Sequence, residues 1–128
     1  MSQTIGQKIL LVEDDRSLAR LYEAKLQKEG YTVEIAADGE ECLEKVGDYQ
    51  PDLILLDIII PKIDGFEVLK RIKADKKLQD IPIILLTNLG QDEDIQKGEQ
   101  LGADVYLIKA NLTPSEMIQK VRGVLEKK

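Results

Sequence analysis

Polar side chains that could do chemistry follow four of the short apolar runs in this chain. The sequence has Glu13, Asp14 and Asp15 after the first run, Asp57 after the third, Thr87 after the fourth and Lys109 after the fifth. Carboxylates about 4 Å apart repel one another by roughly 4 kcal/mol at an intermediate dielectric, so they need a proton or a cation among them. One lysine offsets only one such charge, and magnesium prefers oxygen ligands. If these residues meet in the fold, they predict a divalent-metal site.

Each of these residues, taken alone, has an ordinary structural explanation. Asp15 is well placed to cap the helix that follows it, and Glu13 or Asp57 could simply end a strand. Thr87 could cap a turn, and Lys109 could lie in solvent. Their joint placement at the ends of separate runs is what favours a shared site over these separate explanations.

The apolar runs and the segments between them predict a strict alternation of strands and helices. Strands are expected at 8–12, 31–36, 52–57, 81–86 and 104–108, with helices beginning at Asp15, Asp38, Asp64, Gln91 and Thr113. Unbroken apolar runs are typical of a parallel sheet with both faces buried. We expect the most apolar run, 52–57, at the centre and the alternating run, 31–36, at an edge. Such a sheet has helices on both faces and binds ligands beyond the carboxyl ends of its strands.

Local patterns predict where the helices begin and which side they bury. Capping boxes are expected at Asp38–Glu41, Asp64–Glu67 and Thr113–Glu116. The first helix is expected to end at Gly30. Its inward face is expected to contain Leu18, Leu21, Tyr22 and Leu26.

The composition indicates an ordinary globular chain and excludes several kinds of chemistry. With 128 residues, 43% of them hydrophobic, it is expected to form one domain over 1–128, with 1–7 as a flexible N-terminus. The net charge of −6 without a basic patch argues against direct nucleic-acid binding. The absence of histidine excludes histidine acid–base chemistry and histidine metal ligands. The single cysteine, Cys42, is expected to be a small buried residue.

No stretch of the sequence has the apolar length of a signal peptide or of a membrane-spanning helix. We therefore expect a cytoplasmic protein without membrane attachment.

Four motifs, in this order and spacing, resemble the receiver domain of two-component response regulators over nearly the whole chain. They are Leu-Leu-Val-Glu-Asp-Asp at 10–15, Asp-Ile-Ile-Ile-Pro-Lys-Ile-Asp-Gly at 57–65, Leu-Leu-Thr-Asn at 85–88 and Gly-Ala-Asp-Val-Tyr-Leu-Ile-Lys at 102–109. The resemblance implies an α/β, flavodoxin-like, doubly wound (βα)5 fold. Its five-stranded parallel sheet has the order 2-1-3-4-5, with helices on both faces.

By this resemblance, Asp57 is the nucleophile that becomes an aspartyl phosphate, and Thr87 and Lys109 contact the phosphoryl oxygens. The implied cofactor is Mg²⁺ or Mn²⁺. Its expected ligands are Asp14, Asp57 and the backbone carbonyl of Ile59, with Glu13 acting nearby or through water. The same resemblance implies that the protein is not a conventional enzyme. It would catalyse its own metal-dependent phosphorylation and dephosphorylation by positioning and charge neutralisation.

The resemblance also implies partners and a switch. The donor would be a phosphohistidine on a sensor histidine kinase or a histidine phosphotransfer protein. After phosphorylation, Thr87 is expected to move toward the phosphoryl group and Tyr106 to turn inward. The face made by the fourth helix, fifth strand and fifth helix would then be read by a downstream protein target, and it offers a place for a phosphorylation-dependent dimer. The sequence shows no output domain, so the chain is expected to be a stand-alone regulator or part of a longer protein.

Three residues depart from the family's pattern. Ile60 stands where methionine is common, and Asn88 stands where a small residue is usual. Ala110 stands where a cis proline usually follows the lysine. A cis bond without proline costs about 3 kcal/mol, so the Lys109–Ala110 peptide is either strained or trans.

Two apolar residues lead to an expectation about the lifetime of the phosphorylated form. Ile59 and Leu89 lie two positions beyond Asp57 and Thr87. Both are expected to flank the path of an attacking water molecule. Because neither can orient water by hydrogen bonding, self-dephosphorylation is expected to be slow.

Three other classes of protein are alternatives to this one. A receiver-like interaction module that works without phosphorylation has no need for intact Asp57, Thr87 and Lys109. A phosphatase of the haloacid dehalogenase type needs a second acid two residues after its nucleophile, where Ile59 stands. A flavodoxin-like electron carrier needs a first loop that cradles phosphate, which the acidic run 13–15 would repel, and more aromatic residues than the 4% present.

Overall fold

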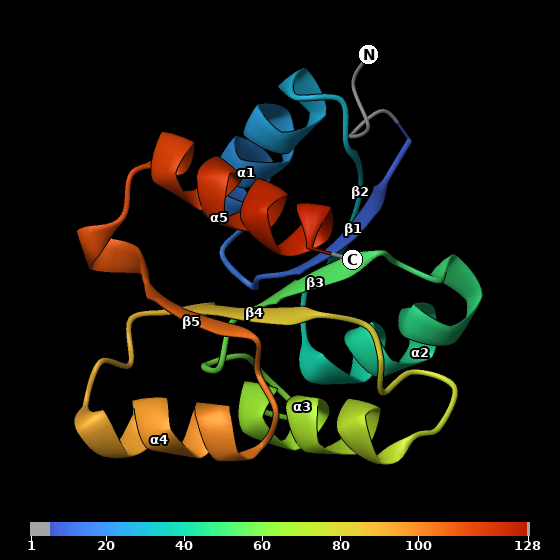
Figure 1. Ribbon diagram of the computed structural model, residues 1–128, viewed down its shortest axis with the longest axis vertical. Helices are drawn as coiled ribbons and strands as arrows, with labels where there is room; N and C mark the ends of the chain where they lie inside the picture. Colours follow the sequence, from blue (N-terminus) through green and yellow to red (C-terminus); the bar gives the residue numbers. More distant parts are fainter. Residues whose placement is uncertain (1–5, 128) are drawn as a thin grey trace.

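The computed structural model describes residues 6–127 and has the predicted alternation of strands and helices (Figure 1). The strands are β1 (Lys8–Val12), β2 (Thr32–Ala36), β3 (Leu53–Leu56), β4 (Ile83–Thr87) and β5 (Val105–Ile108). The helices are α1 (Arg16–Lys28), α2 (Gly39–Tyr49), α3 (Gly65–Ala74), α4 (Asp92–Gln100) and α5 (Pro114–Glu126). A short 3-10 turn, η1 (Lys109–Asn111), follows β5 and was not predicted.

The five strands form one parallel sheet in the order β2-β1-β3-β4-β5, so the predicted topology is confirmed. β3 lies at the centre and β2 at an edge, as expected. Val12 is paired with Ala36 on one side and with Leu56 on the other. The strands therefore end in register, and the residues that follow β1 and β3 start from neighbouring points on one edge of the sheet.

Side chains of the central strands alternate between two apolar cores, one on each face of the sheet. Leu11 and Leu55 pack in the core shared with α1 and α5, whereas Leu10 and Ile54 pack in the core shared with α2 and α3. Figure 1 shows α1 and α5 on one side of the sheet and α2, α3 and α4 on the other. Because both faces are covered, strand residues can be apolar at every position, which explains the unbroken runs.

Side-chain caps fix the first turns of four helices. Asp15, Asp38, Asp64 and Thr113 each accept a hydrogen bond from the backbone N–H three residues further on. Only Thr113–Glu116 forms the predicted reciprocal capping box. For the other two boxes, the prediction that the glutamate side chain accepts the N–H of the capping aspartate was wrong. Glu41 accepts the N–H of Ala37, and Glu67 pairs with Arg71.

The predicted inward face of α1 was wrong at one position. Ala19, Tyr22 and Leu26 are buried, whereas Leu21 is 44% exposed. Successive residues of a helix are rotated by about 100°, so burial of Tyr22 turns Leu21 toward solvent. Leu18 packs partly buried against the same core, as expected.

Cys42 is buried in α2, as predicted, and burial raises the pKa of its thiol to about 12.

Of the segment 1–7 that was expected to be flexible, residues 1–5 lie outside the described part of the chain. The Gly6 N–H donates to the Gly30 carbonyl at 3.2 Å, and the Gln7 carbonyl accepts the Thr32 N–H at 2.9 Å. Within residues 6–127, no helix is long and apolar enough to span a membrane.

Candidate functional site

The backbone ladders of the sheet continue for one residue into the predicted site. The Glu13 N–H donates to the Ala36 carbonyl at 3.0 Å, and the Asp57 N–H donates to the Val12 carbonyl at 3.1 Å. Glu13 and Asp57 are therefore held beside each other at the ends of β1 and β3. In this strand order the connections diverge between β1 and β3, which is where doubly wound sheets bind ligands.

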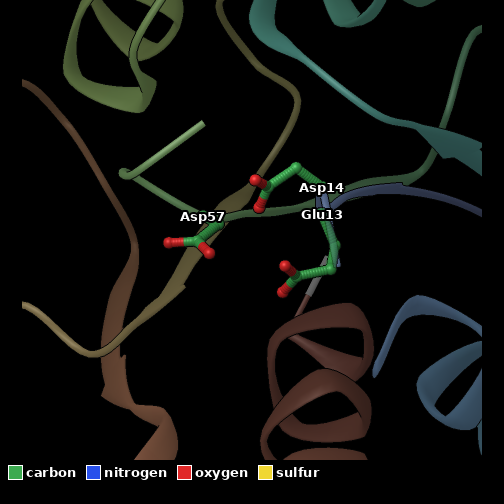
Figure 2. Close-up of side chains that lie close together, drawn as sticks. All are labelled: Glu13, Asp14 and Asp57. Atoms are coloured by element: carbon green, nitrogen blue, oxygen red, sulfur yellow. The ribbon is translucent and has the colours of Figure 1, made fainter. Parts of the chain in front are cut away.

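Three carboxyl groups converge at this point (Figure 2). Glu13, Asp14 and Asp57 each offer a carboxylate oxygen, and these atoms all lie within 4.8 Å of one another. Glu13 and Asp57 are only 3% and 6% exposed, whereas Asp14 is exposed. Asp15, the third acid of the run, caps α1 through the Leu18 N–H at 3.1 Å. The acid run thus supplies two members of the cluster and one helix cap.

Lys109 joins the cluster from the end of β5. Its ammonium nitrogen lies 2.6 Å from Asp57 Oδ2 and also forms an ion pair with Glu13 Oε1. Burial by itself lowers the pKa of Lys109, but the hydrogen bonds to Asp57 and Glu13 outweigh it and raise the pKa above its ordinary value of 10.5. Lys109 is therefore charged at neutral pH. The sequence alone had not predicted that one lysine would be shared between two carboxylates.

The two oxygens of Glu13 are both engaged. Oε1 is paired with Lys109, and Oε2 accepts the Asp15 N–H at 3.1 Å. Burial raises the pKa of Glu13 above its ordinary value of 4.5, despite the hydrogen bond from Lys109. Of the two acids that end β1, exposed Asp14 is the more accessible to a cation.

The donor set of this cluster fits a hard divalent cation. The three carboxylates of Glu13, Asp14 and Asp57 and the single ammonium of Lys109 leave a net charge of −2 when all are ionised. Oxygen donors and excess negative charge are what Mg²⁺ and Mn²⁺ prefer. Ile59, whose carbonyl was predicted as a ligand, is 61% exposed, and its N–H donates to Asp57 Oδ1 at 3.2 Å.

Thr87 and Tyr106 lie on the neighbouring strands β4 and β5, and the side chains of both form hydrogen bonds with the backbone of Leu89 in the loop after β4. The buried Thr87 accepts the Leu89 N–H on its hydroxyl oxygen at 3.4 Å. The hydroxyl of Tyr106, a half-buried residue, donates to the Leu89 carbonyl. Burial, followed by the charges of Asp94 and Asp57, raises the pKa of Tyr106 to about 12. Among the described residues, no hydrogen bond links Thr87 to Asp57. The expected contact of Thr87, with the oxygens of a phosphoryl group on Asp57, stays a prediction.

The sequence did not decide whether the Lys109–Ala110 peptide bond is cis or trans. It is trans, as are all peptide bonds among residues 6–127. The Ala110 N–H donates to the Asn88 side-chain oxygen at 3.0 Å. Proline, which is usual at this place in the family, has no N–H to donate. The two departures from the family's pattern, Asn88 and Ala110, are therefore in contact, and only their pairing in the fold reveals it.

Comparison with known proteins identifies the class of this domain. The family described as "Response regulator receiver domain" matches residues 9–122. The DNA-binding dual master transcriptional regulator RpaA of Synechocystis is 40% identical over 120 residues, which are 94% of this chain and 49% of RpaA. The alkaline phosphatase synthesis transcriptional regulatory protein PhoP of Bacillus subtilis is 39% identical over 96% of this chain and 50% of its own length. The chain thus spans about half the length of these curated relatives.

Solved structures agree with this result at the level of the whole fold. The chemotaxis protein CheY4 of Vibrio cholerae is 33% identical, with a TM-score of 0.86 over 93% of this chain and 98% of that one. The BeF3-activated receiver domain of Klebsiella pneumoniae RstA is 31% identical, with a TM-score of 0.86 over the same shares.

Fold and site together define a doubly wound α/β domain with an acidic cluster and a charged lysine where its strand connections diverge. The chain belongs to the response regulator receiver domain family. Its relationship to response regulators is consistent with a two-component function in accepting phosphoryl groups.

Proposed function

We propose that this protein accepts a phosphoryl group on Asp57 and acts as a switch in two-component signalling. The observation that supports this most strongly is the position of Asp57 between a charged lysine and two further carboxylates at the ligand-binding edge of the sheet. A lone aspartate at this place would have no partner to stabilise transferred charge. Residues 6–127 are proposed to act as one domain.

In the proposed reaction, a carboxylate oxygen of Asp57 attacks the phosphorus atom of the donor. A new O–P bond forms while the bond from phosphorus to the donor's nitrogen or oxygen breaks, and the leaving group keeps the electron pair and takes a proton from water. Lys109 stays protonated and opposes the negative charge that develops on the phosphoryl oxygens. Thr87 accepts a hydrogen bond from Leu89, so its own hydroxyl proton remains available to donate to a phosphoryl oxygen.

Asp14, Asp57 and the carbonyl of Ile59 are the groups proposed to hold Mg²⁺ or Mn²⁺. The engagement of both Glu13 oxygens supports an indirect role for that residue. When bound, the cation supplies positive charge that offsets repulsion between the carboxylates and the phosphoryl oxygens.

The proposed donor is a phosphohistidine on a sensor histidine kinase or a histidine phosphotransfer protein, and the proposed location is the cytoplasm, where such donors act. The proposed output is a protein target, or a second copy of this chain, that reads the face of α4, β5 and α5. Support for this face comes from Tyr106 on β5, whose hydroxyl contacts the loop that follows Thr87.

Beryllofluoride, which imitates a phosphoryl group on a carboxylate, provides the test. In Mg²⁺ together with beryllium and fluoride, we expect the thermal unfolding midpoint of the wild type to rise, because the ligand binds only the folded state. The Asp57→Asn variant should show no such rise. An equal rise in this variant, or none in the wild type, would contradict the proposal. The latter outcome would favour an interaction module that works without phosphorylation.

The Ile59→Asn variant is expected to lose its phosphoryl group faster than the wild type. Ile59 is exposed beside Asp57, so an amide there can orient a water molecule that isoleucine cannot. Decay should be followed after the donor is removed, with Leu21→Asn as a control at another exposed apolar position. Leu89, the other residue expected to flank the path of the water molecule, packs partly buried against the core, so the Ile59 variant alone is the cleaner test. An unchanged decay rate would contradict this role for Ile59.

A further inference from the structure

The loop between β3 and α3 holds Asp57 and Ile59 at its start and rests on the beginning of α2 further along. The Gly39 N–H donates to the Pro61 carbonyl at 3.3 Å. The same carbonyl accepts the Ile63 N–H at 2.8 Å, which closes a tight turn at this point. The outer part of the loop is therefore attached to α2 through the backbone of Gly39.

Lys62 strengthens this attachment from the tip of the turn. It is one of two non-glycine residues in the described chain with a positive φ, at 70°. Its ammonium lies 3.7 Å from an Asp38 oxygen and 3.5 Å from a Glu40 oxygen, on either side of Gly39. The Lys62 side chain is 58% exposed, so these ion pairs contribute little energy, but they show that the turn faces α2.

The contact at Gly39 leaves no room for a side chain. A Cβ atom on this residue would overlap the Ile63 carbonyl oxygen and lie 2.8 Å from the carbonyl carbon and 2.9 Å from the Cβ of Ile63. Two of these are backbone atoms, which cannot move aside by changing a rotamer. Any larger residue at position 39 must therefore push the loop away from α2.

The connection between β2 and α2 also supports the other half of the acidic cluster. The carbonyl of Ala36, three residues before Gly39, accepts the Glu13 N–H at 3.0 Å. A single short segment, 36–41, thus contacts both the loop after Asp57 and the acids after β1. A displacement of the loop relative to this segment changes the spacing between Asp14 and Ile59, the groups proposed to hold the cation.

We infer that Gly39 is a positioning residue for the cation site: the absence of a side chain lets the β3–α3 loop rest on α2, and this contact sets the distance between Ile59 and Asp14. This inference rests on the proposed function, because it concerns the cation that Asp57 chemistry requires. Gly39 itself supplies none of the ligand atoms proposed for the cation; its contacts in the loop are with Pro61 and Ile63.

A Mg²⁺ titration followed by NMR of the backbone amides tests the inference. Gly39→Ala should bind Mg²⁺ about tenfold more weakly than the wild type, as is typical when a residue supporting metal ligands is lost. Gly47→Ala is the matched control, since it makes the same change in the same helix and its Cβ would meet no atom within 4 Å. Its affinity should equal that of the wild type.

A general loss of stability must be separated from a loss of positioning. Val121→Ala removes buried side-chain volume from α5, in the core on the opposite face of the sheet from the core that contains Ile58 and Ile60 of the loop, so it should lower the unfolding midpoint and leave Mg²⁺ affinity unchanged. The wild type offers a second readout that needs no variant. Coupling between sites is reciprocal, so Mg²⁺ should slow hydrogen exchange at the Gly39 amide as well as at Ile59.

The outcomes distinguish this inference from the proposed function. Wild type that binds no Mg²⁺ would overturn both. Wild type and Gly39→Ala that bind Mg²⁺ equally would overturn only the positioning role. Should Gly39→Ala fail to fold, exchange at Gly39 that is unaffected by Mg²⁺, while exchange at Ile59 slows, would also overturn it.

Discussion

Replacing Lys109 with methionine is expected to destabilise the metal-free protein by about 3 kcal/mol at neutral pH, because it leaves two carboxylates close together and buried without their cation. Lys109 pairs with Asp57 and Glu13, whose side chains are 8% and 3% exposed. The measurement is the free energy of unfolding from urea titrations. Lys25→Met, an exposed position in α1, is the control and should change stability by no more than about 0.5 kcal/mol.

The pH dependence of this difference follows from the two pKa shifts. The pKa of Lys109 is raised in the folded state, so its stabilising contribution is fully present below pH 10.5 and is lost as the pH rises through the folded value. The pKa of Glu13 is also raised, which means that its charged form costs stability above the folded pKa and that protonation relieves the cost at lower pH. The deficit of Lys109→Met should therefore be largest near neutral pH and shrink toward both acid and alkali.

Mg²⁺ should restore much of the stability of Lys109→Met. Without the ammonium, the carboxylates keep their excess negative charge, so the cation gains a stronger interaction in the variant than in the wild type. The expected result is a larger Mg²⁺-induced rise in the unfolding midpoint of the variant. An equal rise in both proteins would contradict the account of Lys109 as the cation that balances this cluster.

Gly65→Ala is expected to be the second large change, with a stability loss of about 2 kcal/mol and a strong drop in the rate of phosphoryl acceptance. A Cβ atom at Gly65 would overlap the Asp57 carbonyl oxygen and lie 2.6 Å from the Ile58 Cα. Both are backbone atoms directly after β3, so the only relief is a shift of Asp57 and Ile58 or of the start of α3. The Gly65 N–H also donates to the Ile58 carbonyl at 2.9 Å, and such a shift would weaken this bond.

Gly123→Ala in α5 is the matched control for Gly65→Ala. Its Cβ would meet nothing within 4 Å, so the variant should be more stable by about 0.5–1 kcal/mol and should accept phosphoryl groups at the wild-type rate. Rates of phosphorylation by acetyl phosphate, measured well below the unfolding midpoint of each protein, separate the two effects. A wild-type rate in Gly65→Ala would show that the spacing between Asp57 and α3 does not matter for the reaction.

The sheet and the order of its elements could be predicted because the central strands β1, β3 and β4 are buried on both faces and show this in their unbroken apolar composition, whereas β2 alternates as an edge strand does. The apolar run 52–57 predicts a central strand, and Leu53–Leu56 do form the central strand of the sheet. The Thr113 capping box was equally local, and it formed as expected. Patterns within a few residues of one another are enough for features of this kind.

Features that depend on packing between distant segments could not be predicted. The exposure of Leu21 depends on how α1 is rotated on the sheet, and an apolar residue one position from the buried face looks the same in sequence. The hydrogen bond between Asn88 and Ala110 joins the loop after β4 to the 3-10 turn η1 after β5, and only the fold sets the separation of these segments. The lack of space at Gly39 comes from Ile63 in another segment, so its local sequence predicts only a helix start.

The candidate site falls between these two cases. Parallel topology brings residues after successive strands to one edge, so the convergence of Asp14 and Asp57 with Lys109 could be expected from their order alone. The individual hydrogen bonds and ion pairs of these residues could not be predicted. Lys109 is shared with Glu13, and Thr87 is turned to Leu89, because side-chain length and rotamer decide these contacts after the fold has formed.

The most direct test of the central claim is the intact mass of the protein after incubation with acetyl phosphate and Mg²⁺, with Asp57→Asn measured beside it. Asp48→Asn, an exposed position in α2, serves as the matched control. We predict that the wild type and Asp48→Asn gain the mass of one phosphoryl group, that chelation of Mg²⁺ prevents the gain, and that Asp57→Asn shows none. A gain in Asp57→Asn equal to that of the wild type, or no gain in folded wild type with Mg²⁺ present, would contradict the claim that Asp57 is the phosphoryl acceptor.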